Sequence, residues 1–172
     1  MHADRVGVQL PKVPQPFYPV FGQASGIQYP LLRGPPVATR TIELMTIENI
    51  EVIKQVYEAF GRQDLEGLLR LVDPNCVITQ DAALPWGGRH VGHDGVTAFA
   101  FALLGSLDSA VTVESLFEAD GQVIQCGRTK GTVRANGNAF DIPEVHIWTL
   151  KDGKVVATHF AIDTPAMLAA LV

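Results

Sequence analysis

Residues 111–162 read VTVESLFEADGQVIQCGRTKGTVRANGNAFDIPEVHIWTLKDGKVVATHFAI, and this stretch contains three two-residue turn signals, Asp120-Gly121, Asn136-Gly137 and Asp152-Gly153. Both central positions of a type I′ turn need a positive φ, which Asn, Asp and Gly tolerate and most other residues do not. Three such turns in series predict an antiparallel meander of four strands, at Val111–Ala119, Val123–Arg134, Ala139–Leu150 and Val155–Ile162.

Helical spacing of apolar residues dominates the sequence before the meander. Ile50, Ile53, Tyr57 and Phe60 form one face of a helix that starts at Met45 and stops at Gly61. Further elements are predicted as a short helix capped by Asp64, a strand Cys76–Asp81, a loop over residues 82–90, a helix Asp94–Leu104 and a C-terminal helix from Thr164-Pro165. Helices kept apart from a curved antiparallel sheet define an α+β fold with the helices on one face.

The first 44 residues differ from the rest of the chain. They hold seven of the eleven prolines and show no periodicity, so residues 1–44 are expected to form an extended or disordered arm and residues 45–172 one globular domain. Without the arm's four basic and two acidic residues, the net charge changes from −5 to −7. An acidic domain without a basic stripe argues against nucleic acid and anionic membranes as partners.

The sequence contains no obvious targeting or membrane-spanning stretch, and we expect a cytoplasmic protein. Its two cysteines, Cys76 and Cys126, lie far apart in predicted strands, without the spacing of a zinc site. Both are expected to be small buried residues of the core. Nothing in the sequence calls for a cofactor or a metal.

The order helix, helix, strand, helix, four strands resembles the nuclear-transport-factor-2-like cone fold, specifically its SnoaL-like and ketosteroid-isomerase-like branch. The residues that carry the resemblance are Val56–Gly67 (VYEAFGRQDLEG), Gly92–Val96 (GHDGV), Val145–Trp148 (VHIW) and Phe160–Thr164 (FAIDT). The resemblance implies a cone-shaped pocket and a homodimer formed through the sheet. It does not fix the reaction, because this fold carries isomerases, dehydratases, cyclases, hydrolases and plain binding proteins.

The turns also predict which side chains share a face of the sheet. With regular hairpins, His146 lies opposite His159 and Gly127, on a face shared with Gln125, Glu144, Trp148 and Asp163. The other face carries Arg128, Lys130 and Arg134, whose charges are costly to bury without partners, so the histidine face is expected to line the pocket. A bulge would reverse this assignment locally.

Asp163, His146, Asp81 and His159 are the candidate catalytic residues. Desolvation in an apolar pocket moves the pKa of a carboxyl group toward neutrality, and histidine already titrates there. The resemblance places Asp163 near the acid/base aspartate of SnoaL-like cyclases, with His146 and Trp148 near the polar pair on the preceding strand. The alternative for Asp163 is a cap of the C-terminal helix, and the alternative for the two histidines is a partly exposed pair.

Asp81 lies within a residue of the general base of ketosteroid isomerases, although Gln80 aligns better. The isomerase's oxyanion tyrosine falls near Val56, beside Tyr57, and its protonated acid near Val145. These differences argue against steroid isomerisation, since the donors for a developing enolate are missing.

The ligand-binding candidates form a larger set of mostly aromatic and polar residues: Tyr57, Phe60, Trp86, Phe99, Gln125, Glu144 and Trp148. Trp86, in a loop with Gly87 and Gly88, is expected to act as a lid or, alternatively, as a packed anchor. A metal site of Glu144, His146 and His159 is a further alternative.

Together these features predict a cofactor-independent isomerase, cyclase or dehydratase that binds a hydrophobic small molecule. The alternative from another class is a non-catalytic module for ligand binding or dimerisation.

Overall fold

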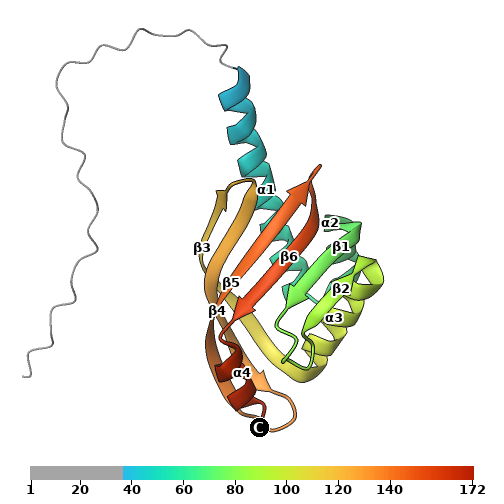
Figure 1. Cartoon of the computed structure of the whole chain (residues 1–172), viewed down its shortest axis with the longest axis vertical. Coiled ribbons are helices and arrows are strands. Elements are labelled where there is room, and N and C mark those ends of the chain that lie inside the picture. Colours follow the sequence, from blue (N-terminus) through green and yellow to red (C-terminus); the bar gives the residue numbers. More distant parts are fainter. Residues whose placement is uncertain (1–36) are drawn as a thin grey trace, which may run out of the picture. The chain divides into compact units, whose positions relative to one another are not determined.

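The computed structural model describes the chain from Val37 to Val172, and its side chains from Glu48 onward (Figure 1). The remaining residues of the expected arm, 1–36, lie outside the described part. The elements in chain order are α1 (Val37–Gly61), α2 (Leu65–Leu71), β1 (Val72–Gln80), β2 (Gly88–Val91), α3 (Gly92–Ser106), β3 (Leu107–Ala119), β4 (Gln122–Val133), β5 (Ala139–Lys151), β6 (Lys154–Ile162) and α4 (Thr164–Ala170).

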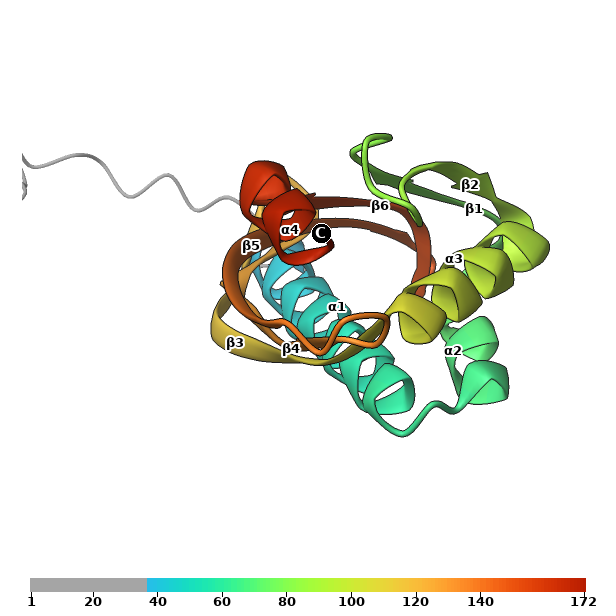
Figure 2. The same cartoon turned by 90° about the horizontal axis from the view of Figure 1, so that it is seen from below.

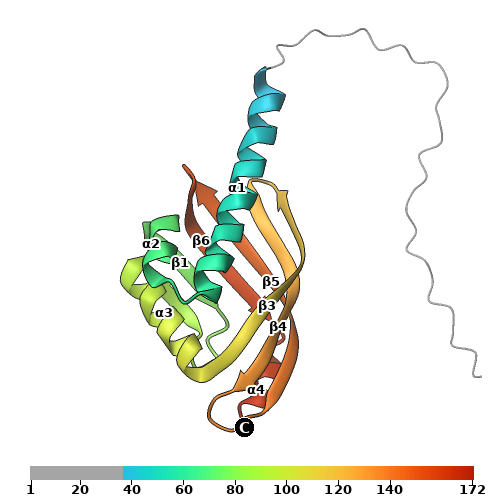
Figure 3. The ribbon, with the colours of Figure 1, turned by 180° about the vertical axis from the view of Figure 1, so that it is seen from behind.

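The strands form one sheet in the order β2-β1-β6-β5-β4-β3. Strands β1 and β6 are parallel and all other neighbours are antiparallel. The sheet curls around α1, while α3 lies beside β1 and β2 (Figure 2). The predicted α+β fold with helices on one face of a curved sheet is confirmed, and the view from behind shows α1 and α3 on that face (Figure 3).

Helix α1 is longer than the sequence pattern indicated. It begins at Val37 rather than Met45, so the expected arm overlaps its first turns, and it ends at Gly61 as predicted. Its apolar stripe packs into the core, where Ile53 is fully buried and Val56 and Ala59 are nearly so. The residues of β2 were expected to form a loop, because four residues are too few to show the alternation of a strand. In the structure they form a short strand that pairs with β1.

Two short helices begin at aspartates that cap them. The Gly67 N–H donates to Asp64 Oδ1 at 2.8 Å at the start of α2, and the Ala166 N–H donates to Asp163 Oδ1 at 3.0 Å at the start of α4. Pro165 occupies the first turn of α4, where its missing N–H costs nothing. Both helix starts therefore agree with the prediction.

Two of the three predicted tight turns are present. Asp120-Gly121 and Asp152-Gly153 have positive φ at both residues, as a type I′ turn requires. Asn136-Gly137 is different, because only Gly137 has positive φ and the paired strands end at Thr132 and Ala139. The prediction of a two-residue turn at this position is wrong.

The longer β4–β5 loop moves the register by two residues, so His146 pairs with Gln125 instead of Gly127. An even shift keeps the faces unchanged, because side chains alternate with period two. Gln125, Glu144, His146 and Trp148 are all buried on the concave side, and the predicted face of β4 and β5 is correct. On the outer face, Arg128 and Lys130 form ion pairs with Asp141.

Strand β6 breaks the pattern. Next to the turn, β6 pairs with β5 in the predicted register, with Leu150 opposite Val155. Beyond that pair the register shifts by one residue, so that Thr149 pairs with Ala157 and His146 with Phe160. This odd shift is a bulge, and it reverses every later side chain of β6. Thr158, Phe160 and Ile162 therefore face the interior, whereas the regular hairpin predicted His159 there.

No helix within residues 37–172 combines the length and the apolar character needed to cross a bilayer.

Candidate functional site

A cavity of about 320 Å³ lies between α1, α3 and the concave face of the sheet. Its walls are mainly apolar, and they include Val56, Leu68, Ile78, Val96, Phe99 and Leu107. A volume of this size is at the lower end of the range for small-molecule sites. The cavity therefore fits a compact, largely apolar molecule.

A chain of polar contacts crosses one side of this cavity. Trp148 Nε1 donates to the Tyr57 hydroxyl at 3.3 Å, and that hydroxyl lies 2.8 Å from His146 Nδ1. His146 Nε2 lies 3.3 Å from Glu144 Oε2, and Gln125 Nε2 donates to Glu144 Oε1 at 3.4 Å. Helix α1 supplies Tyr57, β4 supplies Gln125, and alternate residues of β5 supply the other three.

The protons of this chain follow from the chemistry of Tyr57. Burial raises the pKa of its hydroxyl far above the ordinary value; the Trp148 N–H opposes the rise and the Glu144 carboxylate adds to it. The hydroxyl therefore keeps its proton at neutral pH and donates it to His146 Nδ1, the acceptor beside it. A neutral His146 then carries its own proton on Nε2, the nitrogen that lies 3.3 Å from Glu144 Oε2.

Aromatic rings surround His146 on the cavity side. The Phe160 ring centroid lies 4.5 Å from that of His146, and Phe160 also stacks against Phe99 at 5.5 Å. Tyr57 meets Trp148 edge to face at 5.7 Å. These rings offer flat, polarisable surfaces to a bound ring and exclude water from the imidazole.

The structure brings most of the predicted ligand-binding residues together. Tyr57, Phe60, Trp86, Phe99, Glu144 and Trp148 all line the cavity, as does His146. Trp86 is only 1% exposed, and its loop is held by His90 Nε2, which lies 3.0 Å from the Trp86 carbonyl oxygen. In this structure Trp86 is thus a packed wall rather than a lid. Gln125 lies behind the cavity wall, wholly buried.

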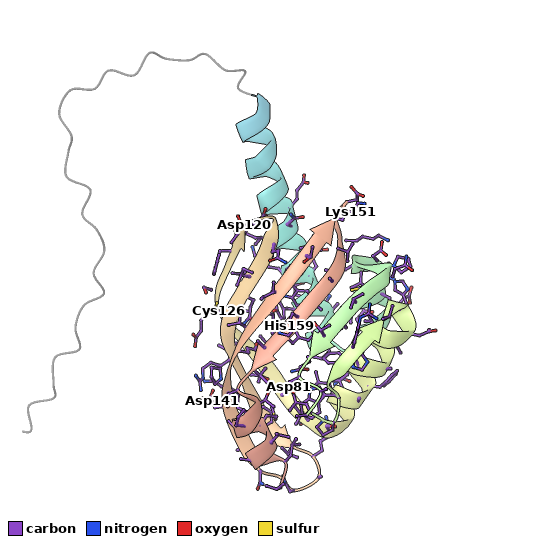
Figure 4. The ribbon with its side chains drawn as sticks, in the orientation of Figure 1. Asp81, Asp120, Cys126, Asp141, Lys151 and His159 are labelled. Atoms are coloured by element: carbon purple, nitrogen blue, oxygen red, sulfur yellow. The ribbon has the colours of Figure 1, made fainter. Side chains whose placement is uncertain are left out.

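Three predicted catalytic residues lie outside the cavity. His159 is exposed on the outer face of β6, where its Nδ1 lies 2.9 Å from Thr79 Oγ1 (Figure 4). Its placement in the pocket was wrong because of the bulge in β6. The proposed metal set of Glu144, His146 and His159 is consequently not assembled.

Asp163 and Asp81 are also exposed and do not line the cavity. The Asp163 carboxylate caps α4, which is the alternative role that the sequence left open. Asp81 accepts a hydrogen bond from the Ala83 N–H in the turn after β1 and lies at the end of that strand (Figure 4). The expectation that either carboxylate shares the pocket with His146 is wrong.

Phe160 and Thr158 are cavity residues that the sequence assignment missed, since both were placed on the outer face. The signal that could have revealed them is Phe160 itself, because a large aromatic that shares its face with Ile162 suits an interior better than a surface. Cys76 also lines the cavity, is 1% exposed as expected, and burial raises the pKa of its thiol to about 11. From Glu48 onward, no cluster of three or more His, Cys, Asp and Glu residues is placed to hold a metal ion.

The fold and the cavity define a nuclear-transport-factor-2-like cone, and comparisons with known proteins give its family. Residues 53–158 match the model of the SnoaL-like domain, so the chain belongs to the SnoaL-like domain family. No curated protein matches the chain significantly.

Solved structures give the same fold. A nuclear-transport-factor-2-like protein of unknown function from Burkholderia pseudomallei is 26% identical, with a TM-score of 0.68 over 73% of this chain and 98% of that one. TerC, crystallised with polyporic acid, is also 26% identical, with a TM-score of 0.66 over 72% of this chain and 98% of that one. A proposed SnoaL-like polyketide cyclase from Jannaschia is 20% identical, with a TM-score of 0.66 over 73% and 92%.

Proposed function

We propose that this protein binds a compact, ring-bearing and largely apolar molecule with a carbonyl group, and that it moves a proton on that molecule without a cofactor. The observation that carries the proposal is the buried chain from Tyr57 through His146 to Glu144 in the wall of the cavity. Such a chain supplies a proton acceptor, a partner that stabilises its charged form, and a hydroxyl donor at one place. TerC, a relative crystallised with a small molecule, is consistent with this use of the fold.

His146 is the base in this proposal. In this structure its Nδ1 lone pair accepts the Tyr57 proton. A ligand carbonyl oxygen that takes over the Tyr57 O–H frees this lone pair, which then removes a proton from the carbon next to the carbonyl. The resulting imidazolium is stabilised by the Glu144 carboxylate at its Nε2–H.

Tyr57 has the complementary role. Its hydroxyl donates to the oxygen on which negative charge develops as the carbon loses its proton, and a donor of this kind typically contributes about 10²–10³ in rate. The elevated pKa of the hydroxyl keeps the proton in place, so Tyr57 donates a hydrogen bond rather than transferring the proton outright.

The fate of the enolate decides the reaction type. Return of the proton from the His146 imidazolium to the far carbon of a conjugated enolate gives isomerisation. Departure of a β-hydroxyl group, which takes that proton and leaves as water, gives dehydration. Attack of the enolate on a second carbonyl, whose oxygen takes the proton, gives cyclisation. All three use the same first step, so the residues support this group of reactions rather than one member of it.

The first step can be tested without knowledge of the natural substrate. We expect the protein to catalyse exchange of the C–H protons beside the carbonyl of 2-tetralone, a bicyclic apolar ketone, with deuterium from D₂O, followed by NMR. His146→Gln should abolish the exchange. His159→Gln, which changes an exposed imidazole on the outer face, is the matched control and should leave the rate unchanged. Binding of the ketone without exchange would instead favour a non-catalytic binding protein.

A further inference from the structure

Gln125 has an environment that packing alone does not explain. Its side chain is 0% exposed and lies outside the cavity lining, where an apolar residue of similar size would avoid burying an amide. Its Nε2 donates to Glu144 Oε1 at 3.4 Å, while its Oε1 has no partner in the described part of the chain. A buried polar atom left without a partner costs about 1–3 kcal/mol.

The backbone around Gln125 makes room for this one contact. In the β4–β5 register Gln125 stands opposite His146, and Gly127 stands opposite Glu144, so the Gln125 amide must cross diagonally to reach the carboxylate. A Cβ at Gly127 would lie 2.6 Å from Gln125 Nε2 and 2.1 Å from the Thr112 carbonyl oxygen. The absence of a side chain at Gly127 therefore leaves the path open.

Glu144 Oε1 accepts a hydrogen bond from Gln125 Nε2, and Glu144 Oε2 lies 3.3 Å from His146 Nε2. The Gln125 amide is therefore the hydrogen-bond donor that holds the carboxylate in this orientation beside the imidazole. The other groups against His146 are Tyr57 from α1, Trp148 from β5 and Phe160 from β6, and all three are uncharged at neutral pH. The Tyr57 hydroxyl favours a lone pair on Nδ1, and the Glu144 carboxylate is the charged group that favours the proton on Nε2.

We propose that Gln125 is a positioning residue, which holds the Glu144 carboxylate so that His146 keeps its proton on Nε2 and presents the Nδ1 lone pair toward Tyr57 and the cavity. Gln125 touches no substrate in this role and acts only through Glu144. The catalytic consequence rests on the function proposed above, but the arrangement of protons does not.

The test reads the protons of His146 directly. In ¹⁵N-labelled protein, long-range ¹H–¹⁵N NMR spectra distinguish the two neutral tautomers and the charged form of each imidazole, and His146→Gln assigns the signals. The wild-type protein should show the Nε2–H form of His146 at neutral pH. In Gln125→Leu the signals should change to a mixture of the two tautomers, since the carboxylate is released on one side.

The matched control is Gln122→Leu. Gln122 lies on the same strand, but its Nε2 donates to Thr149 Oγ1 at 3.0 Å, away from His146. This variant should leave the His146 signals unchanged. Unchanged tautomer signals in a folded Gln125→Leu variant would overturn the proposal.

Gln125→Glu keeps the volume and covers the case in which the leucine variant does not fold. It places a second carboxyl group beside Glu144, and two buried carboxyl groups this close share one proton, so the new group can still donate to Glu144. His146 should therefore keep the Nε2–H form in this variant, and a mixture of tautomers would overturn the proposal. A wild-type protein with the expected tautomer but no exchange of 2-tetralone protons would refute the proposed function and leave the positioning role standing.

Discussion

The Tyr57→Phe substitution tests the hydrogen-bond chain through stability alone, without a substrate. It removes the hydroxyl that accepts from Trp148 Nε1 and donates to His146 Nδ1. Two interior polar groups then lose a partner, and leaving a buried group unpaired costs about 1–3 kcal/mol. At neutral pH we therefore expect the variant to unfold with a free energy about 1–3 kcal/mol lower than the wild type.

This advantage of the wild type should disappear in alkali. Burial raises the pKa of Tyr57 in the folded protein, whereas in the unfolded chain the hydroxyl titrates near the ordinary value of about 10. Above pH 10 the unfolded state releases a proton that the folded state retains, so the wild type loses about 1.4 kcal/mol of stability per pH unit through this group. Below pH 10 both states keep the proton and the difference is constant.

The assay is urea unfolding of the two proteins between pH 7 and pH 11.5, followed by the fluorescence of Trp86 and Trp148, which are both buried. The other two tyrosines and all lysines are common to both proteins and cancel in the difference. By pH 11.5 the difference should shrink by about 2 kcal/mol. A difference that stays constant across this range would refute both the raised pKa and the buried hydroxyl on which the proposed function depends.

Three further outcomes follow from the structure. Asp163→Ala removes the cap of α4, so it should lower the free energy of unfolding by about 1 kcal/mol and leave 2-tetralone exchange intact; lost exchange in the folded variant would restore Asp163 as a catalyst. Iodoacetamide should label Cys76 at pH 8 only after unfolding, because burial raises the pKa of its thiol to about 11. Cys126 is less buried, so the labelled site is identified by peptide mass, and rapid labelling of Cys76 in the folded protein would contradict this. Gly105→Ala should stabilise the protein by about 0.5–1 kcal/mol, because the added Cβ in α3 meets open space. Gly127→Ala should destabilise the protein, because its Cβ would meet the Thr112 carbonyl oxygen, and thermal unfolding of the two variants checks the contrast.

The sequence predicts the sheet well wherever a local signal sets the geometry. Asp120-Gly121 and Asp152-Gly153 fix two hairpins through residues that accept positive φ. Asn136-Gly137 is an equally strong turn signal but forms a longer loop, in which the Asn136 and Asn138 side chains donate to a carbonyl oxygen at the end of α4. That partner lies more than thirty residues away in the sequence, so a local pattern gives no sign of it.

The faces of the sheet were predicted correctly on the strands that preserve alternation and wrongly on the strand that does not. The two-residue error at the β4–β5 loop was harmless, since an even shift returns each side chain to the same face. The one-residue error in β6 exchanged His159 for Phe160 in the interior. Helix α1 contributed Tyr57 as expected because helical spacing depends on no distant register.

The bulge in β6 also explains the character of the site. A regular hairpin would turn His159 toward the cavity beside His146, and two facing imidazoles would favour water, metal ions or charge there. The extra residue brings in Thr158, Phe160 and Ile162 instead, which leaves His146 with Glu144 as its charged neighbour among the residues described and encloses it in aromatic rings. In the proposed function, a single imidazole beside one carboxylate in a largely apolar cavity is suited to take a proton from carbon, because the surrounding rings limit the access of water to it. The bulge in β6 therefore determines which side chains surround His146, and with them whether the cavity suits the proposed proton transfer.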